Sequence, residues 1–140
     1  MLVSFCVIAY NEEKALDSLF KDIIAQDYPH GNIEVILVNA MSTDQTRRKM
    51  EHFSEEDHGF RRVVVLDNAK KIQAAGWNVA ITASKGDIIL RIDAHTMIPH
   101  DFVSKNVQCI LSGENVTGGR RPNVVEEETP WKHTLLLAES

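Results

Sequence analysis

The chain has 140 residues, which suffices for one domain with a sizeable core and is too short for two ordinary ones. With 44% hydrophobic residues, 25% charged residues, seven Gly and four Pro, its composition excludes disordered, collagen-like and coiled-coil chains. Fifteen Lys and Arg against twenty Asp and Glu give a formal net charge of −5. This balance argues against the broad basic surface of a nucleic-acid-binding protein, so we expect no nucleic-acid partner.

Cysteine usage and the lack of a targeting segment indicate a cytosolic protein. Cys6 and Cys109 lie far apart and form no C-x-x-C pair, so we expect two small apolar residues in a reducing compartment. The apolar stretch 2–9 has no basic residue ahead of it and is far shorter than the ~20 residues of a membrane span. The last residues, 135–140, look like an unfinished helical turn, so we expect the chain to be truncated at its C-terminus.

Short apolar runs predict the strands of a buried sheet. Such runs are nearly continuous in Val, Ile and Leu, as in strands that are covered on both faces. They occupy Val3–Ala9, Ile33–Val38, Arg61–Leu66 and Ile88–Ile92, and 115–117 begins a fifth.

The segments between these runs predict four helices, the first of which has an amphipathic stripe. The first helix is expected to begin after an N-cap at Asn11, and the second at a capping box of Ser42 and Gln45. The third is expected to end at Gly86 in the left-handed conformation, and the fourth to have Pro99 in its first turn and to end at Gly113. Alternating strands and helices imply right-handed crossovers. The sequence therefore predicts an α/β fold with a mostly parallel sheet and helices on both faces.

Ligands of such sheets bind beyond the carboxyl ends of the strands. The segments expected there are Tyr10–Glu13, Asn39–Asp44, Asp67–Lys71 and Asp93–Thr96. The loop after the first run has no glycine and the chain has no GxxxxGK[ST] motif, which argues against dehydrogenases and P-loop enzymes. The phosphates of a bound nucleotide would then need another positive charge, and a metal ion is the obvious source.

Asp93-Ala94-His95 is the candidate metal motif. In an extended backbone residues i and i+2 project to the same side, so both side chains can converge on one cation. A carboxylate with an imidazole suits Mn²⁺ better than Mg²⁺. A capping aspartate followed by an ordinary loop histidine would give the same spacing.

Four stretches together resemble a known family. They read VSFCVIAYNEE (3–13), EVILVNAMSTD (34–44), IQAAGWN (72–78) and GDIILRIDAH (86–95). They resemble the family 2 glycosyltransferases of the GT-A fold, whose usual pattern is "AYNEE … VVDDGSTDGT", and most closely the succinoglycan-biosynthesis subgroup. The resemblance covers residues 2–121 and implies that residues 1–140 form the nucleotide-sugar-binding part of a catalytic domain.

The resemblance also implies roles for single residues. Asp93 and His95 correspond to the family's DxD motif, which binds a divalent cation, Mn²⁺ or Mg²⁺, and the nucleotide. We assign nucleotide binding to Tyr10, Glu12, Asn39, Lys70 and Asp93. Tyr10 would stack on the base or pack on the sheet edge, and Lys70 would lie near the phosphates or simply on the surface. Trp77 is expected in the core, and Asn78 is either a core amide or a ligand contact.

Two departures from the family pattern bear on the site. Asn39 and Ala40 stand where the family usually has one or two Asp residues, which leaves the base preference open. His95 replaces the last carboxylate of DxD, which removes a negative charge from the metal site. The family's general base normally lies later in the chain, and Glu126, Glu127, Glu128 and Glu139 match no motif.

The predicted function is inverting, metal-dependent transfer of a sugar from a nucleotide-sugar, with UDP-sugars expected, to a glycan or lipid-linked acceptor in polysaccharide synthesis. A binding module without turnover and a sugar-nucleotide nucleotidyltransferase are the alternatives, although Tyr10–Glu13 lacks the latter's glycine-rich basic loop. The apolar stretch 135–137 would seek a missing segment or a second copy of the chain. Membrane association is expected only through a part beyond Ser140.

Overall fold

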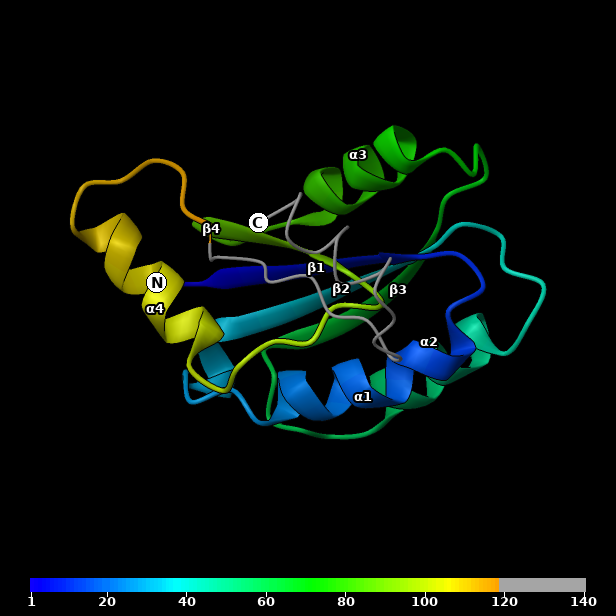
Figure 1. Cartoon of the computed structure of the whole chain (residues 1–140), viewed down its shortest axis with the longest axis horizontal. Coiled ribbons are helices and arrows are strands. Elements are labelled where there is room, and N and C mark those ends of the chain that lie inside the picture. Colours follow the sequence, from blue (N-terminus) through cyan, green and yellow to red (C-terminus); the bar gives the residue numbers. More distant parts are fainter. Residues whose placement is uncertain (119–140) are drawn as a thin grey trace, which may run out of the picture.

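The computed structural model describes residues 1–118, which form a layered α/β structure (Figure 1). In chain order these residues form β1 (Val3–Ala9), α1 (Glu13–Ile24), the short 3₁₀ turn η1 (His30–Asn32), β2 (Ile33–Asn39), α2 (Thr46–Glu55), β3 (Arg62–Asp67), α3 (Gln73–Ala83), β4 (Ile88–Asp93) and α4 (Phe102–Leu111). The four predicted strands and four predicted helices within this range are confirmed.

The four described strands make one parallel sheet in the order β3-β2-β1-β4. Helices α1, α2 and α4 pack on one face of this sheet and α3 packs on the other (Figure 1). The chain winds outward from β1 through β2 to β3, and then crosses back to place β4 on the other side of β1. The direction of winding thus reverses between β1 and β4, which is the position where open α/β sheets bind ligands.

The strands alternate their side chains between two apolar cores. Phe5 and Val7 of β1 pack against the α1, α2 and α4 layer, whereas Cys6 packs with Trp77 and Ala80 of α3. Each of these strand side chains is fully buried, and burial of one such side chain contributes roughly 1.5–3 kcal/mol. Trp77 lies in the core as expected, with the guanidinium of Arg91 4.3 Å from its ring centroid.

The two cysteines have different surroundings. Cys6 is buried, as expected for a small apolar residue, and this burial raises the pKa of its thiol. Cys109 lies on the exposed side of α4, and neither cysteine forms a disulfide.

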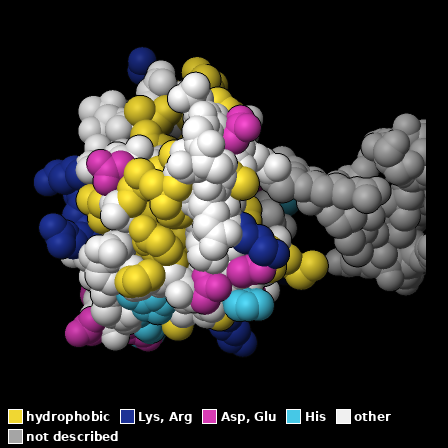
Figure 2. All heavy atoms as spheres, turned by 90° about the vertical axis from the view of Figure 1, so that its left-hand side faces the viewer, with side chains coloured by type: hydrophobic (Ala, Val, Ile, Leu, Met, Phe, Trp, Pro, Cys, Tyr) yellow, Lys and Arg dark blue, Asp and Glu magenta, His cyan; other side chains and the backbone are white. Residues whose placement is uncertain are grey.

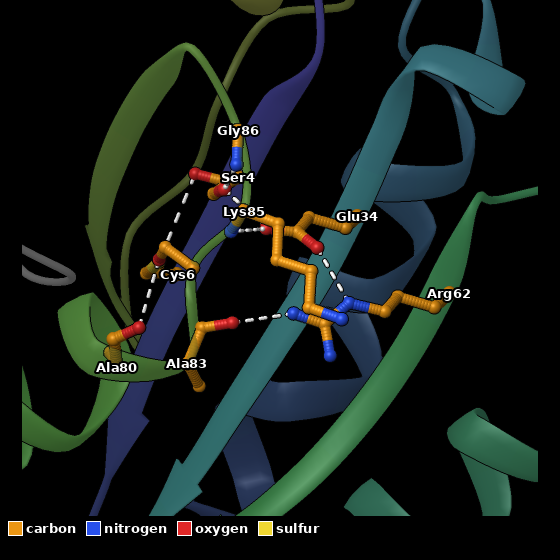
Figure 3. A network of polar contacts seen from close by, with 9 residues as sticks. Ser4, Cys6, Glu34, Arg62, Ala80, Ala83, Lys85 and Gly86 are labelled. Carbon is orange, nitrogen blue, oxygen red and sulfur yellow. Dashed lines mark hydrogen bonds and ion pairs between the residues drawn. The ribbon is translucent and has the colours of Figure 1, made fainter.

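A buried carboxylate ties the connection between α3 and β4 to the sheet (Figure 3). Glu34 of β2 is 1% exposed, and it accepts hydrogen bonds from the Ser4 hydroxyl, the Lys85 N–H (2.6 Å) and the Arg62 Nε (2.6 Å). Arg62 also donates to the carbonyl of Ala83 at the end of α3. Desolvation would raise the pKa of Glu34, but these hydrogen bonds outweigh it and hold the pKa below its usual range.

Gly86 has a different role from the one predicted. Helix α3 ends at Ala83, and Gly86 is not in a left-handed conformation. Instead, its N–H donates to the Ser4 hydroxyl (2.8 Å), and a Cβ at this position would lie 2.5 Å from that oxygen and 2.6 Å from the Ser4 nitrogen. Glycine is required because the backbone passes so close to β1.

Several predicted boundaries are corrected by the structure. Helix α1 begins after Glu12 and α2 after Gln45, so neither Asn11 nor the pair of Ser42 and Gln45 caps a helix as expected. Helix α4 begins at Phe102, after Pro99, and ends before Gly113, whose φ of 111° confirms the predicted stop. No strand forms at 115–117.

The amino-terminal end of the sheet carries a band of hydrophobic side chains with charged groups on both sides (Figure 2). This is the end of the sheet opposite to the one where the predicted site residues lie.

Within residues 1–118, no helix is long and apolar enough to cross a membrane.

Candidate functional site

The predicted site segments all follow the carboxyl ends of the strands. In the sheet register Ala9, Asn39 and Asp67 lie side by side at the ends of β1, β2 and β3, and Asp93 ends β4 opposite Ile8. The segments after β1 and β4 therefore meet where the winding of the sheet reverses. This places Tyr10, Glu12 and the Asp93 motif on one rim.

The loops after β1 and β2 interlock through backbone and side-chain hydrogen bonds. The Asn11 N–H donates to the Ser42 hydroxyl (3.0 Å), and the Asn11 side-chain oxygen accepts from the Thr43 N–H (2.8 Å). Glu13 repeats this exchange, because its N–H donates to Asp44 (3.3 Å) and its carboxylate accepts from the Gln45 N–H (2.9 Å). The residues that carry the family resemblance here thus hold two loops together.

Asp44 anchors this interlocked pair of loops. Its carboxylate accepts hydrogen bonds from the backbone of Thr46 (2.9 Å) and of Glu13. Partial desolvation would raise the pKa of Asp44, but the hydrogen bonds from Thr46 and Glu13 outweigh it and lower the pKa below the usual value. Asp44 therefore remains ionised and locks the loops well below neutral pH.

Within residues 1–118, three non-glycine residues adopt the left-handed conformation, each in a loop that follows a strand. Asn11, Met41 and Lys71 have φ values of 49°, 59° and 62°, and they follow β1, β2 and β3 respectively. Asparagine tolerates this region, but Met and Lys do so only at an energetic cost. Backbone strain of this kind gathers at functional sites, so it marks the same rim independently of the motifs.

Asn39 is held inside the protein by its neighbours. It is 2% exposed, its side-chain oxygen accepts from the Ser42 N–H (3.1 Å), and its amide nitrogen lies 3.4 Å from Oδ1 of Asp67. Asp67 also pairs with Arg47 of α2. Sequence reasoning missed Asp67 as the partner of Asn39, because the two residues are 28 positions apart in the chain and only the strand register reveals their contact.

The Asp93 motif does not continue the strand. Ala94 and His95 form a turn that the Thr96 N–H closes on the Asp93 carbonyl (3.0 Å), so the predicted extended geometry of the motif is wrong. His95 instead points its Nδ1 at Oε1 of Glu12, 3.1 Å away on the loop after β1. Asp93 itself is half-buried at the rim.

The remaining predicted residues lie on the surface around this rim. Tyr10 is 54% exposed, which leaves its ring accessible. Lys70 is exposed and lines an open hollow of about 600 Å³ between the end of β3 and α3, a size typical of small-molecule sites. Asn78 is also exposed and lines this hollow, so its interpretation as a core amide is wrong.

Asp93 and His95 are the residues at the rim that could hold a divalent cation together with a phosphate ligand. Within residues 1–118 no group of three or more His, Cys, Asp and Glu side chains could enclose a metal ion. Asp93 and His95 nevertheless offer one carboxylate and one imidazole, a donor pair suited to Mn²⁺. Such a pair leaves coordination positions for phosphate oxygens and water, as is usual for metals at nucleotide sites.

Comparisons with known proteins identify a family and relatives that cover most of the chain. The sequence matches the family described as Glycosyl transferase family 2 over residues 4–139. The dolichyl N-acetyl-alpha-D-glucosaminyl phosphate 3-beta-D-2,3-diacetamido-2,3-dideoxy-beta-D-glucuronosyltransferase of Methanococcus voltae is 27% identical over 106 residues, which are 76% of this chain and 33% of that protein. The succinoglycan biosynthesis protein ExoA of Rhizobium meliloti is 33% identical over 104 residues, which are 73% of this chain and 30% of that protein.

A solved structure shares the fold as well. The mannosyltransferase of Pyrobaculum calidifontis, in complex with GDP-Man and Mn²⁺, superimposes with a TM-score of 0.75 at 25% identity, over 86% of this chain and 36% of that one. The chain spans about a third of the length of the curated relatives described above.

Proposed function

Because the chain belongs to glycosyl transferase family 2 and has the GT-A-like fold, we propose that residues 1–140 form the donor-binding part of an inverting, metal-dependent glycosyltransferase. Its donor is a nucleoside diphosphate sugar, and its acceptor is a glycan or a lipid-linked sugar. One observation carries the proposal. The Asp93 motif and the loop of Tyr10 and Glu12 meet at the carboxyl ends of β4 and β1, where the winding of the sheet reverses.

The rim residues divide the recognition of the donor between them. Asp93 and His95 would hold the cation, which supplies positive charge against the diphosphate as the glycosidic bond breaks. The exposed ring of Tyr10 offers a stacking surface for the base. Lys70, at the hollow beside β3, would add a further positive charge for the phosphates.

A more specific part of this proposal concerns the nucleotide base of the donor. The sequence predicts UDP-sugars, while a related structure holds GDP-Man. The Asn39 side chain has little capacity to bind the nucleotide base directly, because it is buried, accepts a hydrogen bond from the Ser42 N–H and lies against Asp67. We therefore expect Asn39 to act by placing Asp67 and the loop after β2, and both nucleotides belong in the test.

Transfer requires a base for the acceptor hydroxyl in addition to the donor site. Glu126, Glu127, Glu128 and Glu139, which the sequence leaves as unmatched acidic residues, lie outside the described residues. The stretch 135–137, expected to seek a partner, lies outside them too. Positioning two reactants contributes on the order of 7–11 kcal/mol in favourable cases, so a site that holds only the donor should be a very slow catalyst.

A thermal-stability screen tests the proposal. We expect UDP or GDP, each with Mn²⁺, to raise the melting temperature of the chain, because a ligand at 100 times its Kd adds about 2.7 kcal/mol to the free energy of unfolding. UMP and GMP with Mn²⁺ are the controls, since they lack the diphosphate that the cation would bridge. Stabilisation by none of the diphosphates, or an equal effect of the monophosphates, would contradict a diphosphate site.

A further inference from the structure

The contact between Glu12 and His95 joins the two loops that meet at the rim. Oε1 of Glu12 lies 3.1 Å from Nδ1 of His95, although the two residues are 83 positions apart in the chain. The Glu12 side chain is 28% exposed and that of His95 is 67% exposed. The acid is thus partly enclosed, while the imidazole extends from it into solvent.

Glu12 is held firmly by its backbone. Its N–H donates to the hydroxyl of Thr46 in α2 (2.8 Å). Its carbonyl accepts from the N–H groups of Ala15 and Leu16, both at 3.1 Å, in the first turn of α1. The carboxylate therefore projects from a fixed point between two helices, and it can impose an orientation on its more exposed partner, His95.

The contact determines which nitrogen of His95 carries the proton. A carboxylate only accepts hydrogen bonds, so Nδ1 must donate and carry hydrogen in the neutral ring. Nε2 is then the nitrogen whose lone pair is available. Ligating histidines in metal sites commonly bond a carboxylate through the other ring nitrogen in this way, which fixes the tautomer and the ring orientation.

We propose that Glu12 is a positioning residue that fixes the Nδ1–H tautomer of His95 and turns Nε2 toward the metal site. This inference rests on the proposed metal site of Asp93 and His95 and adds a residue to it. It also replaces direct nucleotide binding, the role that the sequence predicts for Glu12. The juxtaposition arises because β1 and β4 are neighbours in the sheet.

The tautomer can be measured without any metal. In ¹H–¹⁵N correlation spectra of the histidine rings at neutral pH, His95 of the wild-type chain should show the Nδ1–H form. Glu12→Ala should shift His95 toward the Nε2–H form that a free imidazole prefers, and Glu12→Gln, whose side-chain oxygen can still accept, should restore Nδ1–H. Glu13→Ala is the matched control, because it removes a neighbouring carboxylate that bonds Gln45 and does not contact His95.

The same variants are then titrated with Mn²⁺ in the presence of UDP, with free Mn²⁺ followed by electron paramagnetic resonance. Glu12→Ala should weaken Mn²⁺ binding about 10–100-fold, the usual effect of losing such a partner, and Glu12→Gln should weaken it less. His95→Ala is the reference. If His95→Ala weakens Mn²⁺ binding and Glu12→Ala does not, the role of Glu12 is refuted while the metal site stands.

Two other results would also overturn the inference. If His95→Ala leaves Mn²⁺ binding unchanged, the proposed metal site itself is wrong, and the role of Glu12 falls with it. If Glu12→Ala weakens UDP binding equally with Mn²⁺ and with EDTA, Glu12 contacts the nucleotide directly. An unchanged His95 tautomer in Glu12→Ala contradicts the inference irrespective of the titration.

Discussion

At the scale of single residues, the pair of Asn39 and Asp67 shows how a polar side chain beside the site is kept in place. Replacing Asn39 with Asp would put a buried carboxylate at the position of the Asn39 amide, 3.4 Å from the exposed carboxylate of Asp67. We expect Asn39→Asp to lower the free energy of unfolding by about 1–3 kcal/mol at pH 7, because it also removes the donor to Asp67. Urea unfolding followed by circular dichroism measures this change.

Exchanging the two residues provides the control for that prediction. In the double variant Asn39→Asp with Asp67→Asn, an amide again faces a carboxylate. We expect it to be more stable than the sum of the two single changes predicts, with a coupling energy of about 1 kcal/mol or more. Strictly additive effects would show that the two side chains do not interact.

Met41 provides a test of backbone strain in the loop after β2. The usual family pattern has glycine at this position, and here Met41 has a φ of 59°. Met41→Gly should relieve roughly 1–2 kcal/mol of strain and lose part of that through the greater freedom of the unfolded chain, for a net gain of up to about 1 kcal/mol. The melting temperature should therefore rise.

Gln45 is the matched control for Met41. It stands at the second glycine of the family pattern but has a φ of −83°, which any residue adopts without strain. Gln45→Gly should therefore leave the stability unchanged or lower it slightly. Equal stabilisation by both substitutions would argue against backbone strain as the cause.

At the scale of elements, Glu34 links β2, β3 and the segment after α3. Because its pKa is lower in the folded chain than its ordinary value of 4.5, its contribution to stability is present above that pH and is lost as the pH falls toward the folded-state pKa. Glu34→Gln should cost about 2 kcal/mol or more at pH 7, and the stability of the variant should decline less steeply below pH 4.5.

A surface carboxylate separates this effect from a general loss of charge. Glu51 pairs with Arg47 on the exposed face of α2 (2.8 Å). Glu51→Gln should change the free energy of unfolding by less than about 0.5 kcal/mol. Urea titrations between pH 3 and pH 7 compare the two variants, and parallel pH profiles for Glu34→Gln and wild type would refute the role of Glu34.

The elements themselves could be predicted because the strands are largely apolar runs and because α1, α2 and α4 have an amphipathic pattern. Helix α3 lacks such a pattern and is predicted from its place between two strands. Boundaries were missed where distant residues decide them. Asn11 does not cap α1 because its side chain bonds Thr43 in the next loop. Gly86 does not end α3 because its place is set by the approach to Ser4 of β1. Neither contact leaves a local signal in the sequence.

At the scale of the whole molecule, strand order explains which parts of the site could be foreseen. Alternating strands and helices were enough to place Tyr10, Asn39 and Asp93 at the carboxyl ends of a parallel sheet. The sequence does not reveal that β4 pairs with β1 in the sheet. Because the two strands are adjacent, His95 lies within hydrogen-bond distance of Glu12. The motif residues could therefore be located individually, while their pairing required the fold.

The most direct test of the account is a calorimetric titration of the full chain with UDP and with GDP, with Mn²⁺ or with EDTA, for the wild type and for Asp93→Asn. The account predicts that at least one of the two nucleotides binds to the wild type with Mn²⁺. It predicts that EDTA or Asp93→Asn weakens this binding at least tenfold, while the circular dichroism spectrum of the variant is unchanged. Equal affinity of Asp93→Asn and wild type in the presence of Mn²⁺ would contradict it.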